Sequence, residues 1–286
     1  MPELPEVETV RRGLNRVSLN QPVRGGEVRL ARSIAYPELA DAFLEAITSV
    51  QISSWHRRGK YLFATLQQQG HQLELVSAGW LGVHLRMTGQ LLWVSKTEPV
   101  QPHCRVRLFF DGNNELRYVD QRTFGRLWWV PPDRAIESVM TGLQKLGPEP
   151  FSDEFSIDYL ASALRGKQRP IKNALLEQHL VAGIGNIYAD EALFLSGIRP
   201  TAVCDCLSRK RITKLHQAIR DVLTTSIESG GTTFSDFRDV HGTNGNYGGV
   251  AWVYDREGEP CRNCSAEIVR IKLAGRSAHY CPKCQR

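Results

Sequence analysis

The chain has 286 residues, which is enough for one large domain or two ordinary ones. Hydrophobic residues at 42% and charged residues at 23% are normal for a soluble globular protein, and no apolar run approaches the roughly 20 residues of a membrane-spanning helix. Its 36 basic and 30 acidic residues leave a net charge of +6, which suits a polyanionic partner without identifying one. The acidic, proline-rich start is unlike a secretory signal, so we expect a cytoplasmic protein without a membrane partner.

A helix is predicted at the start of the chain, within the segment PELPEVETVRRGL. Pro5 suits its first position, and the carboxylates of Glu6 and Glu8 suit the positive end of a helix dipole. Two arginines precede Gly13, where we expect the helix to end.

The rest of residues 1–132 is predicted to form mainly short β-strands. The segments YLFATLQ, QLLWVSK, RVRLFF and LRYVD are rich in β-branched and aromatic residues, and turn signals such as DGNN separate them. Many short strands at close spacing are typical of a β-sandwich or barrel.

The remainder of the chain divides into four segments by composition. Two proline pairs, Pro131 with Pro132 and Pro148 with Pro150, bracket residues 133–151, which are predicted to be a linker. Residues 152–232 place apolar residues near a 3.6-residue period, so they are predicted to form a helical domain. Residues 233–254 have too many glycines for a packed element and are predicted to be a mobile loop, followed by a cysteine-rich tail over 255–286. The fold class is therefore α+β, with two domains.

The tail contains the motif C-x₂-C-x₁₆-C-x₂-C, formed by Cys261, Cys264, Cys281 and Cys284. Thiolate pairs at this spacing complete a closed tetrahedral site, so we expect one structural Zn²⁺ per chain. Four buried cysteines without a metal and a redox pair are the alternatives that this strong pattern disfavours. The intervening residues alternate like a β-hairpin and carry Arg276, and cations on a zinc ribbon are typical of nucleic-acid contact.

The segment LVAGIGNIYADEALF places two glycines before a predicted helix, with Asn186 as its N-cap. Exposed backbone N–H groups and the helix dipole form an anion site there. An ordinary turn between helices is the alternative. The basic residues Lys167, Arg169 and Lys172 just upstream favour a phosphate.

Pro2 becomes the N-terminal residue if Met1 is removed, and its nitrogen is then a free secondary amine. A terminal amine has a reference pKa of about 7.7–8.0, so part of it is unprotonated at neutral pH and nucleophilic. Attack on a sugar C1′ would expel a base and leave an iminium, and Glu3 could transfer the protons. Many proteins have proline at position two without such a role, so this motif alone does not establish it.

Together, these motifs resemble the formamidopyrimidine-DNA glycosylase family from end to end. PELPEVETVRRGL is similar to its N-terminal signature and LVAGIGNIYADEALF to its helix–two-turn–helix module. GGTTFSDF and GEPCRNC…RSAHYCPKC are similar to its C-terminal loop and zinc finger. The resemblance implies a monomeric, nucleoid-associated base-excision-repair enzyme. It would flip out and excise oxidised purines, 8-oxoguanine and formamidopyrimidines, from duplex DNA and then cleave the strand by β,δ-elimination.

The resemblance also implies roles for individual residues. Pro2 would form the Schiff base and Glu3 would act as acid and base, while Lys60 would serve β-elimination and Arg276 δ-elimination. Six further residues would contact DNA, the first three as a wedge that fills the space left by the flipped base: Met87, Arg122, Phe124, His103, Lys167 and Asn186. Core packing is the ordinary alternative for an isolated Met or Phe. The glycine-rich stretch would close over 8-oxoguanine.

The wedge departs from the family pattern at positions that include 86, 121 and 123. Arg86 stands where H-L-G-M-S-G has glycine, and Gln121 and Thr123 replace proline and arginine of D-P-R-R-F-G. These changes bear on the conformation of the wedge and on the choice of opposite base.

Three other functions compete with this interpretation. An endonuclease VIII-like relative would act on oxidised pyrimidines, but the PELPEVET start differs from the P-E-G-P-E of that branch. A non-catalytic zinc-ribbon protein would still bind nucleic acid with Pro2 blocked. An N-terminal-proline tautomerase would leave the zinc site without a role.

Overall fold

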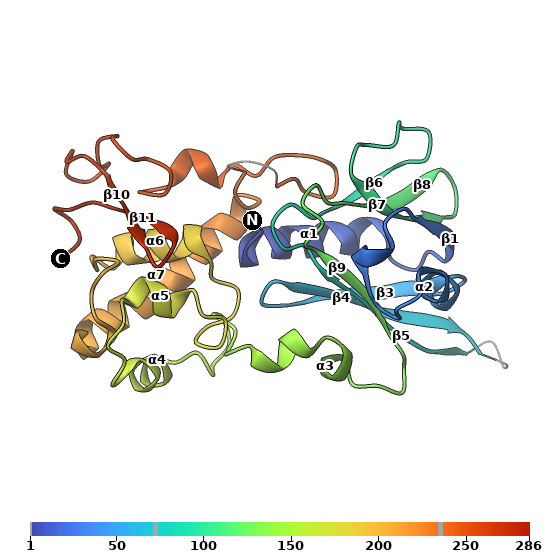
Figure 1. The fold of residues 1–286 in the computed structure, drawn as a ribbon, viewed down its shortest axis with the longest axis horizontal. Coiled ribbons are helices and arrows are strands. Elements are labelled where there is room, and N and C mark those ends of the chain that lie inside the picture. Colours follow the sequence, from blue (N-terminus) through green and yellow to red (C-terminus); the bar gives the residue numbers. More distant parts are fainter. Residues whose placement is uncertain (1, 71–73, 234–236) are drawn as a thin grey trace. The chain divides into compact units, whose positions relative to one another are not determined.

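The computed structural model describes residues 2–70, 74–233 and 237–286. The chain forms two compact units (Figure 1). The first unit contains residues 1–144 and 230–245, and the second contains residues 145–229 and 246–286. A short segment near the C-terminal third of the chain therefore returns to the first unit.

The first unit contains two β-sheets that share one core. The five-stranded sheet has the order β2-β9-β5-β4-β3, and the four-stranded sheet has the order β1-β7-β8-β6. Among the described strands, β2 and β9 pair in parallel and the other neighbours pair antiparallel. The strands are β1 Val23–Val28, β2 Ile34–Tyr36, β3 Gln51–Arg58, β4 Tyr61–Gln69, β5 Leu75–His84, β6 Gln90–Ser95, β7 Cys104–Phe110, β8 Asn114–Val119 and β9 Arg126–Val130. The β-sandwich is confirmed, although β1, β2, β3, β5 and β9 were not identified from the sequence.

Alternation along the strands explains why the two sheets pack face to face. In β7, every second residue is buried, and Val106 and Leu108 point into the core. Leu62 of β4 and Val83 of β5 reach the same core from the other sheet. Burial of apolar surface on both inner faces therefore holds the sandwich together.

Three helices accompany the sandwich: α1 Leu4–Val17, α2 Ala40–Ile47 and α3 Ile136–Val139. The prediction that the first helix ends at Gly13 is wrong, because α1 continues for four more residues. Its apolar stripe, Val7, Val10 and Leu14, runs past the glycine and is completely buried. Burial of this stripe outweighs the weak helix propensity of one glycine.

The glycine-rich stretch packs more closely than the sequence indicated. Phe237 and Val240 belong to the core of the first unit, and the Val240 carbonyl accepts a hydrogen bond of 2.8 Å from the Trp93 backbone N–H. The expectation that this stretch has too many glycines to pack is thus wrong for these residues. Part of the predicted loop, residues 234–236, lies outside the described residues.

The second unit is built around helix α6. Its helices are α4 Ile157–Leu164, α5 Ile171–Leu175, α6 Asn186–Leu195 and α7 Arg209–Glu228, and its hairpin strands are β10 Val269–Leu273 and β11 Arg276–Tyr280. Residues 187–194 of α6 are all buried, because α5, α7 and β11 surround it. Four 3₁₀ turns complete the described elements: η1 Ala31–Ser33, η2 Thr141–Lys145, η3 Cys204–Cys206 and η4 Tyr247–Val250.

The predicted α+β class, with a helical module and a terminal hairpin after a β-sandwich, is confirmed. The finer boundaries at residues 132, 151, 232 and 254 stay predictions. Within the described ranges, none of the helices has both the length and the apolar character required to cross a membrane.

Candidate active site and metal centre

Two connections between the sheets emerge at the same end of the sandwich. Residues 85–89 join β5 to β6, and residues 120–125 join β8 to β9, so each crosses from one sheet to the other. Gln90, which begins β6, pairs with Val119, which ends β8. The flanking strands β5 and β9 also pair where these connections begin and end. The register therefore brings together the two segments that carry Met87, Arg122 and Phe124.

Two more predicted residues lie at this end of the sandwich. Lys60 immediately precedes β4, whose first residue pairs with His84 at the end of β5. His103 immediately precedes β7, whose first residue, Cys104, pairs with Val119. Both side chains are thus positioned by strand register rather than by proximity in the sequence.

Helix α1 runs antiparallel to β3, so its first residues lie toward the same end. Glu8 contacts Arg57 near the end of β3, while Asn15 bonds the backbone of Trp55 further back, with a 2.9 Å bond from the Trp55 N–H. Glu3 lies five residues before Glu8, roughly 7 Å further along the helix axis. The helix therefore directs its N-terminus toward the β3–β4 turn that carries Lys60.

The start of α1 is held by a buried carboxylate. Glu6 accepts the backbone N–H of Glu3 at 2.8 Å with one oxygen and that of Thr232 at 2.7 Å with the other. Both glutamates are 1% exposed, and Pro2 is buried as well. Glu6 thus links the residue after Pro2 to the returning segment of the first unit, a role that its place in the first helical turn did not reveal.

A neutral histidine lies beside two cations near the turn that carries Lys60. The pKa of His84 is lowered to about 3, because burial disfavours the charged ring and the charges of Arg86 and Lys60 lie nearby. The neutral ring accepts the Arg86 backbone N–H at its Nδ1, with a distance of 3.0 Å. Two cations therefore lie near an uncharged imidazole.

The wedge residues are exposed rather than packed in the core. Met87 is 37% exposed and Phe124 is 49% exposed, and the Arg122 guanidinium lies 4.9 Å from the centre of the Phe124 ring. Arg86 and Thr123 adopt φ angles of 55° and 59°, in the left-handed region that favours glycine. The family glycine at position 86 is thus replaced by a residue that keeps a glycine-like conformation.

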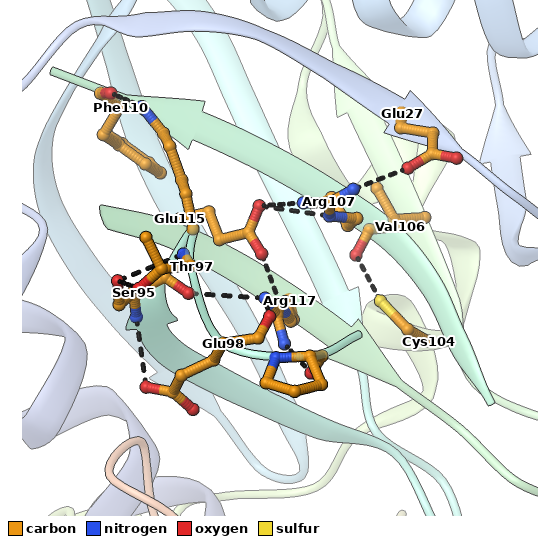
Figure 2. A network of polar contacts seen from close by, with 12 residues as sticks. Glu27, Ser95, Thr97, Glu98, Cys104, Val106, Arg107, Phe110, Glu115 and Arg117 are labelled. Atoms are coloured by element: carbon orange, nitrogen blue, oxygen red, sulfur yellow. Dashed lines mark hydrogen bonds and ion pairs between the residues drawn. The ribbon is translucent and has the colours of Figure 1, made fainter. Parts of the chain in front are cut away.

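Arg117 on β8 is fully buried and holds the connection between β6 and β7 (Figure 2). Its guanidinium donates to the carbonyl oxygens of Glu98 and Pro99, both at 2.8 Å. The buried Glu115 carboxylate pairs with the same guanidinium and balances its charge. This polar network supports the segment that ends at His103.

In the second unit, Asn186 does not cap its helix as predicted. Gly185 is the N-cap of α6, and Asn186 is the first helical residue. Its side-chain amide instead donates to Ser277 Oγ on β11 at 3.2 Å. Asn186 therefore bonds the residue that directly follows the exposed Arg276 in the chain.

Two of the three basic residues assigned to phosphate have other partners. Lys172 is 1% exposed, forms an ion pair of 2.6 Å with Asp190 and donates to the Ser277 carbonyl at 2.5 Å. Arg169 pairs with Glu177. The prediction that Lys172 favours a phosphate at this turn is therefore wrong, because its charge is buried and paired, whereas Lys167 is half-buried.

The acidic residues of α6 organise the segments around it. Glu191 accepts the backbone N–H groups of Trp252, Val253 and Tyr254 at 2.8–2.9 Å and the hydroxyl of Tyr247 at 3.1 Å. Burial raises the pKa of Glu191, and these hydrogen bonds oppose that effect. A pair of acidic residues inside an apolar helix was the signal in the sequence that could have identified this anchor.

The four predicted metal ligands form one cluster at the C-terminal hairpin. The sulfur atoms of Cys261, Cys264, Cys281 and Cys284 all lie within 4.8 Å of one another. The Cys261–Cys284 sulfur distance is 3.9 Å, close to the edge of about 3.8 Å expected for a tetrahedron with Zn–S bonds of about 2.3 Å. The backbone N–H of Cys284 points at the Cys281 sulfur at 3.4 Å, which stabilises a thiolate. The donor set thus fits a closed zinc site.

Comparison with known proteins identifies the family. The profile of the formamidopyrimidine-DNA glycosylase N-terminal domain matches residues 1–127, that of its H2TH domain matches residues 146–238, and a zinc finger found in FPG and IleRS matches residues 258–286. The formamidopyrimidine-DNA glycosylase of Nostoc punctiforme is 61% identical over 285 residues, covering 100% of this chain and 96% of the relative. The chain belongs to the formamidopyrimidine-DNA glycosylase (Fpg) family.

Other Fpg proteins agree with this identification. The enzyme of Acaryochloris marina is 60% identical and is covered to 99%. Lactococcus lactis Fpg in complex with DNA containing an abasic site superposes with a TM-score of 0.88 at 34% identity, with 99% of both chains covered. MutM (Fpg) of Thermus thermophilus gives 0.85 at 37% identity, over 99% of this chain and 98% of that one. The predicted family is thus confirmed: the chain is a DNA glycosylase with lyase activity at abasic sites, and its cysteine cluster is a structural zinc site.

Proposed function

We propose that the chain excises oxidised purines, 8-oxoguanine and formamidopyrimidines, from duplex DNA and then cleaves the strand by β,δ-elimination. A structure of MutM with DNA containing carbocyclic 8-oxoguanine and one of a Lactococcus lactis Fpg mutant with Fapy-dG DNA are both similar to this chain, with TM-scores of 0.87. We further propose that the enzyme acts as a monomer at the bacterial nucleoid.

The proposed nucleophile is the secondary amine of Pro2 after removal of Met1. Its lone pair attacks C1′ of the damaged nucleotide, and the bond to the base breaks with the electron pair leaving on the base. Glu3 supplies a proton to assist base release and opening of the sugar ring, which leaves an iminium on C1′. The iminium acidifies the C2′ proton, whose removal expels the 3′ phosphate. Loss of the 5′ phosphate completes δ-elimination.

Residues of both units have proposed parts in this reaction. In the first unit, Lys60 assists β-elimination, Met87 and Phe124 support the opened stack, and Arg122 bonds the orphaned cytosine. In the second unit, Arg276 grips a phosphate and assists δ-elimination. His103, Lys167 and Asn186 contact the DNA backbone, where their contribution should weaken with salt.

The proposal is best supported by the residues that share one end of the sandwich. The helix that begins beside Pro2 and Glu3, the turn with Lys60, and the exposed Met87 and Phe124 all belong to one end of the same sandwich. A nucleophile, a cation and an apolar wedge at one end match what base flipping and Schiff-base chemistry require. A non-catalytic zinc ribbon or a tautomerase gives no reason for this combination.

Borohydride trapping on duplexes with a single lesion tests the proposal. Protein that begins at Pro2 should form a covalent adduct with DNA containing 8-oxoguanine opposite cytosine. A matched protein with one extra residue before Pro2 should bind the duplex but form no adduct. The absence of an adduct with every lesion would refute the Schiff-base mechanism in this chain.

The same trapping experiment should include a duplex with an oxidised pyrimidine. A complex of Lactococcus lactis Fpg with DNA containing an oxidised pyrimidine is also similar to this chain, with a TM-score of 0.87 at 34% identity. We propose that purine lesions are excised faster. Faster trapping on the pyrimidine lesion would favour the endonuclease VIII-like alternative.

A further inference from the structure

Asp120 is a buried carboxylate beneath the exposed wedge. It is 1% exposed and begins the connection that carries Arg122 and Phe124. One of its oxygens accepts the Thr88 hydroxyl at 2.5 Å. The other accepts the Gly125 backbone N–H at 2.9 Å and the Tyr118 hydroxyl at 3.1 Å. The carboxylate therefore bonds to both of the connections that cross between the sheets.

The Thr88 hydroxyl, which bonds Asp120, also reaches the middle of the connection formed by residues 120–125. While it donates to Asp120, its oxygen accepts the backbone N–H of Arg122 at 3.0 Å. Thr88 directly follows Met87 and is 8% exposed. The hydroxyl of Thr88 thus bonds both Asp120, 32 residues away, and the backbone of Arg122, 34 residues away.

The backbone of Asp120 also contacts His103 and Arg105, at the start of β7. Its N–H donates to the His103 carbonyl at 3.0 Å, and its carbonyl accepts from Arg105 Nε at 2.9 Å. Side chain and backbone together give Asp120 contacts with both wedge connections and with the segment that ends at His103.

We propose that Asp120 and Thr88 are positioning residues that make the two wedge segments one rigid unit. This inference rests on the proposed function, because only there do Met87, Arg122 and Phe124 enter DNA. Exposed side chains have little packing of their own, and each segment contains a residue at an unfavourable positive φ, Arg86 or Thr123. Such a conformation persists only where the surroundings over-determine it, and buried charge-assisted hydrogen bonds do so here.

Thr88→Val and Thr88→Ser form a matched pair of variants. Valine keeps the shape of threonine and removes the hydroxyl, whereas serine keeps the hydroxyl and removes the methyl group. We expect Thr88→Val to slow single-turnover excision of 8-oxoguanine from duplex DNA about tenfold or more, because small misplacements of a positioning group have effects of this size. Thr88→Ser should stay within about twofold of the wild type, since the hydroxyl supplies the positioning bond.

A second reaction separates positioning from general loss of structure. An abasic site in single-stranded DNA requires no base to leave a stack, so its β-elimination does not need the wedge. Thr88→Val should cleave this substrate at the wild-type rate. Tyr118→Phe serves as a control, because it removes one bond to Asp120 without touching the link to Thr88. It should lower the melting temperature and leave the ratio of the two rates unchanged.

Asp120→Asn provides an independent variant if Thr88→Val does not fold. It should slow duplex excision as Thr88→Val does, and a variant carrying both changes should be no slower than the slower single variant, because both remove the same link. Equal duplex rates for Thr88→Val and Thr88→Ser, or equal losses on both substrates, would overturn the inference. Wild-type protein that forms no borohydride adduct would instead refute the proposed function, and borohydride trapping detects that outcome independently of the variants.

Discussion

Arg57 pairs with Glu8 across the interface between β3 and α1, with 3.3 Å between Arg57 Nε and Glu8 Oε2. Both side chains are only 11% exposed. The same guanidinium donates to the Gly59 carbonyl at 3.1 Å, in the turn that precedes Lys60. One arginine thus contacts both the helix that begins beside Glu3 and the turn that carries Lys60.

Glu8→Gln should weaken this junction and change the acid stability of the protein. Burial opposes ionisation of Glu8, but hydrogen bonds from Arg11 and Arg12 and the charges of Arg11 and Arg57 lower its pKa to about 2. A lowered pKa stabilises the fold above pH 4.5, and this stabilisation is lost as the pH falls toward 2. We expect a loss of about 1–2 kcal/mol at pH 7, with allowance for solvent screening.

Denaturant unfolding of Glu8→Gln at several pH values measures this effect. The variant should lose less stability than the wild type between pH 4.5 and 2. Glu45→Gln, at an exposed position of α2, should behave as the wild type does. An unchanged pH dependence in Glu8→Gln would show that this ion pair does not stabilise the fold.

His84 should make the protein less stable in mild acid. Its pKa is about 3 in the folded chain, against 6.5 for an ordinary histidine, so the unfolded state binds a proton first. The stabilisation that the neutral ring provides is therefore complete above pH 6.5 and is lost as the pH drops toward 3, with a loss of about 3 kcal/mol at pH 4.5. His84→Asn keeps an acceptor for the Arg86 N–H and should remove most of this pH dependence. The exposed His241→Asn is the control, and an equal slope in both variants contradicts the prediction.

Gly13→Ala should destabilise the protein, although alanine favours helices. A Cβ atom at position 13 would lie 2.5 Å from Cγ2 of Val240, which is 1% exposed and cannot move aside easily. Overpacking of this kind costs about 1–3 kcal/mol, more than alanine gains in helix propensity. Thermal unfolding should show a lower melting temperature for Gly13→Ala and partial recovery when Val240→Ala is added. No recovery in the double variant would locate the strain elsewhere.

Removal of zinc should destabilise the second unit. Purified protein should contain about one zinc ion per chain, and chelation should unfold the hairpin, because metal binding supplies much of the folding energy of such sites. Loss of the hairpin removes the contacts of Ser277 and His279 with Lys172 and Asp190. Cys264→Ser should have the same effect, whereas Cys206→Ser, at an exposed cysteine outside the cluster, should not. Folded, active protein with little zinc would refute a structural role.

Several features were predictable because they depend on neighbours in the sequence. The spacing of Cys261 and Cys264 reveals a metal knuckle, and alternating residues reveal strands such as β7. The glycines before Asn186 correctly predict a helix start, but the N-cap is Gly185 and not Asn186. Asn186 has a partner on β11, 91 residues away, which no local pattern contains.

The sequence by itself determined the fold class, the zinc ligands and, through its motifs, the family. Each of these follows from short-range spacing, which the chain carries wherever its parts come to lie. Only the tertiary structure decided which loops share one end of the sandwich, why Gly13 is a glycine, and that Lys172 is buried. The bond between Glu6 and Thr232 joins residues 226 apart, and that between Thr88 and Asp120 joins residues 32 apart. Such contacts arise from strand register and core packing, because burial brings distant polar groups together and then requires them to be paired.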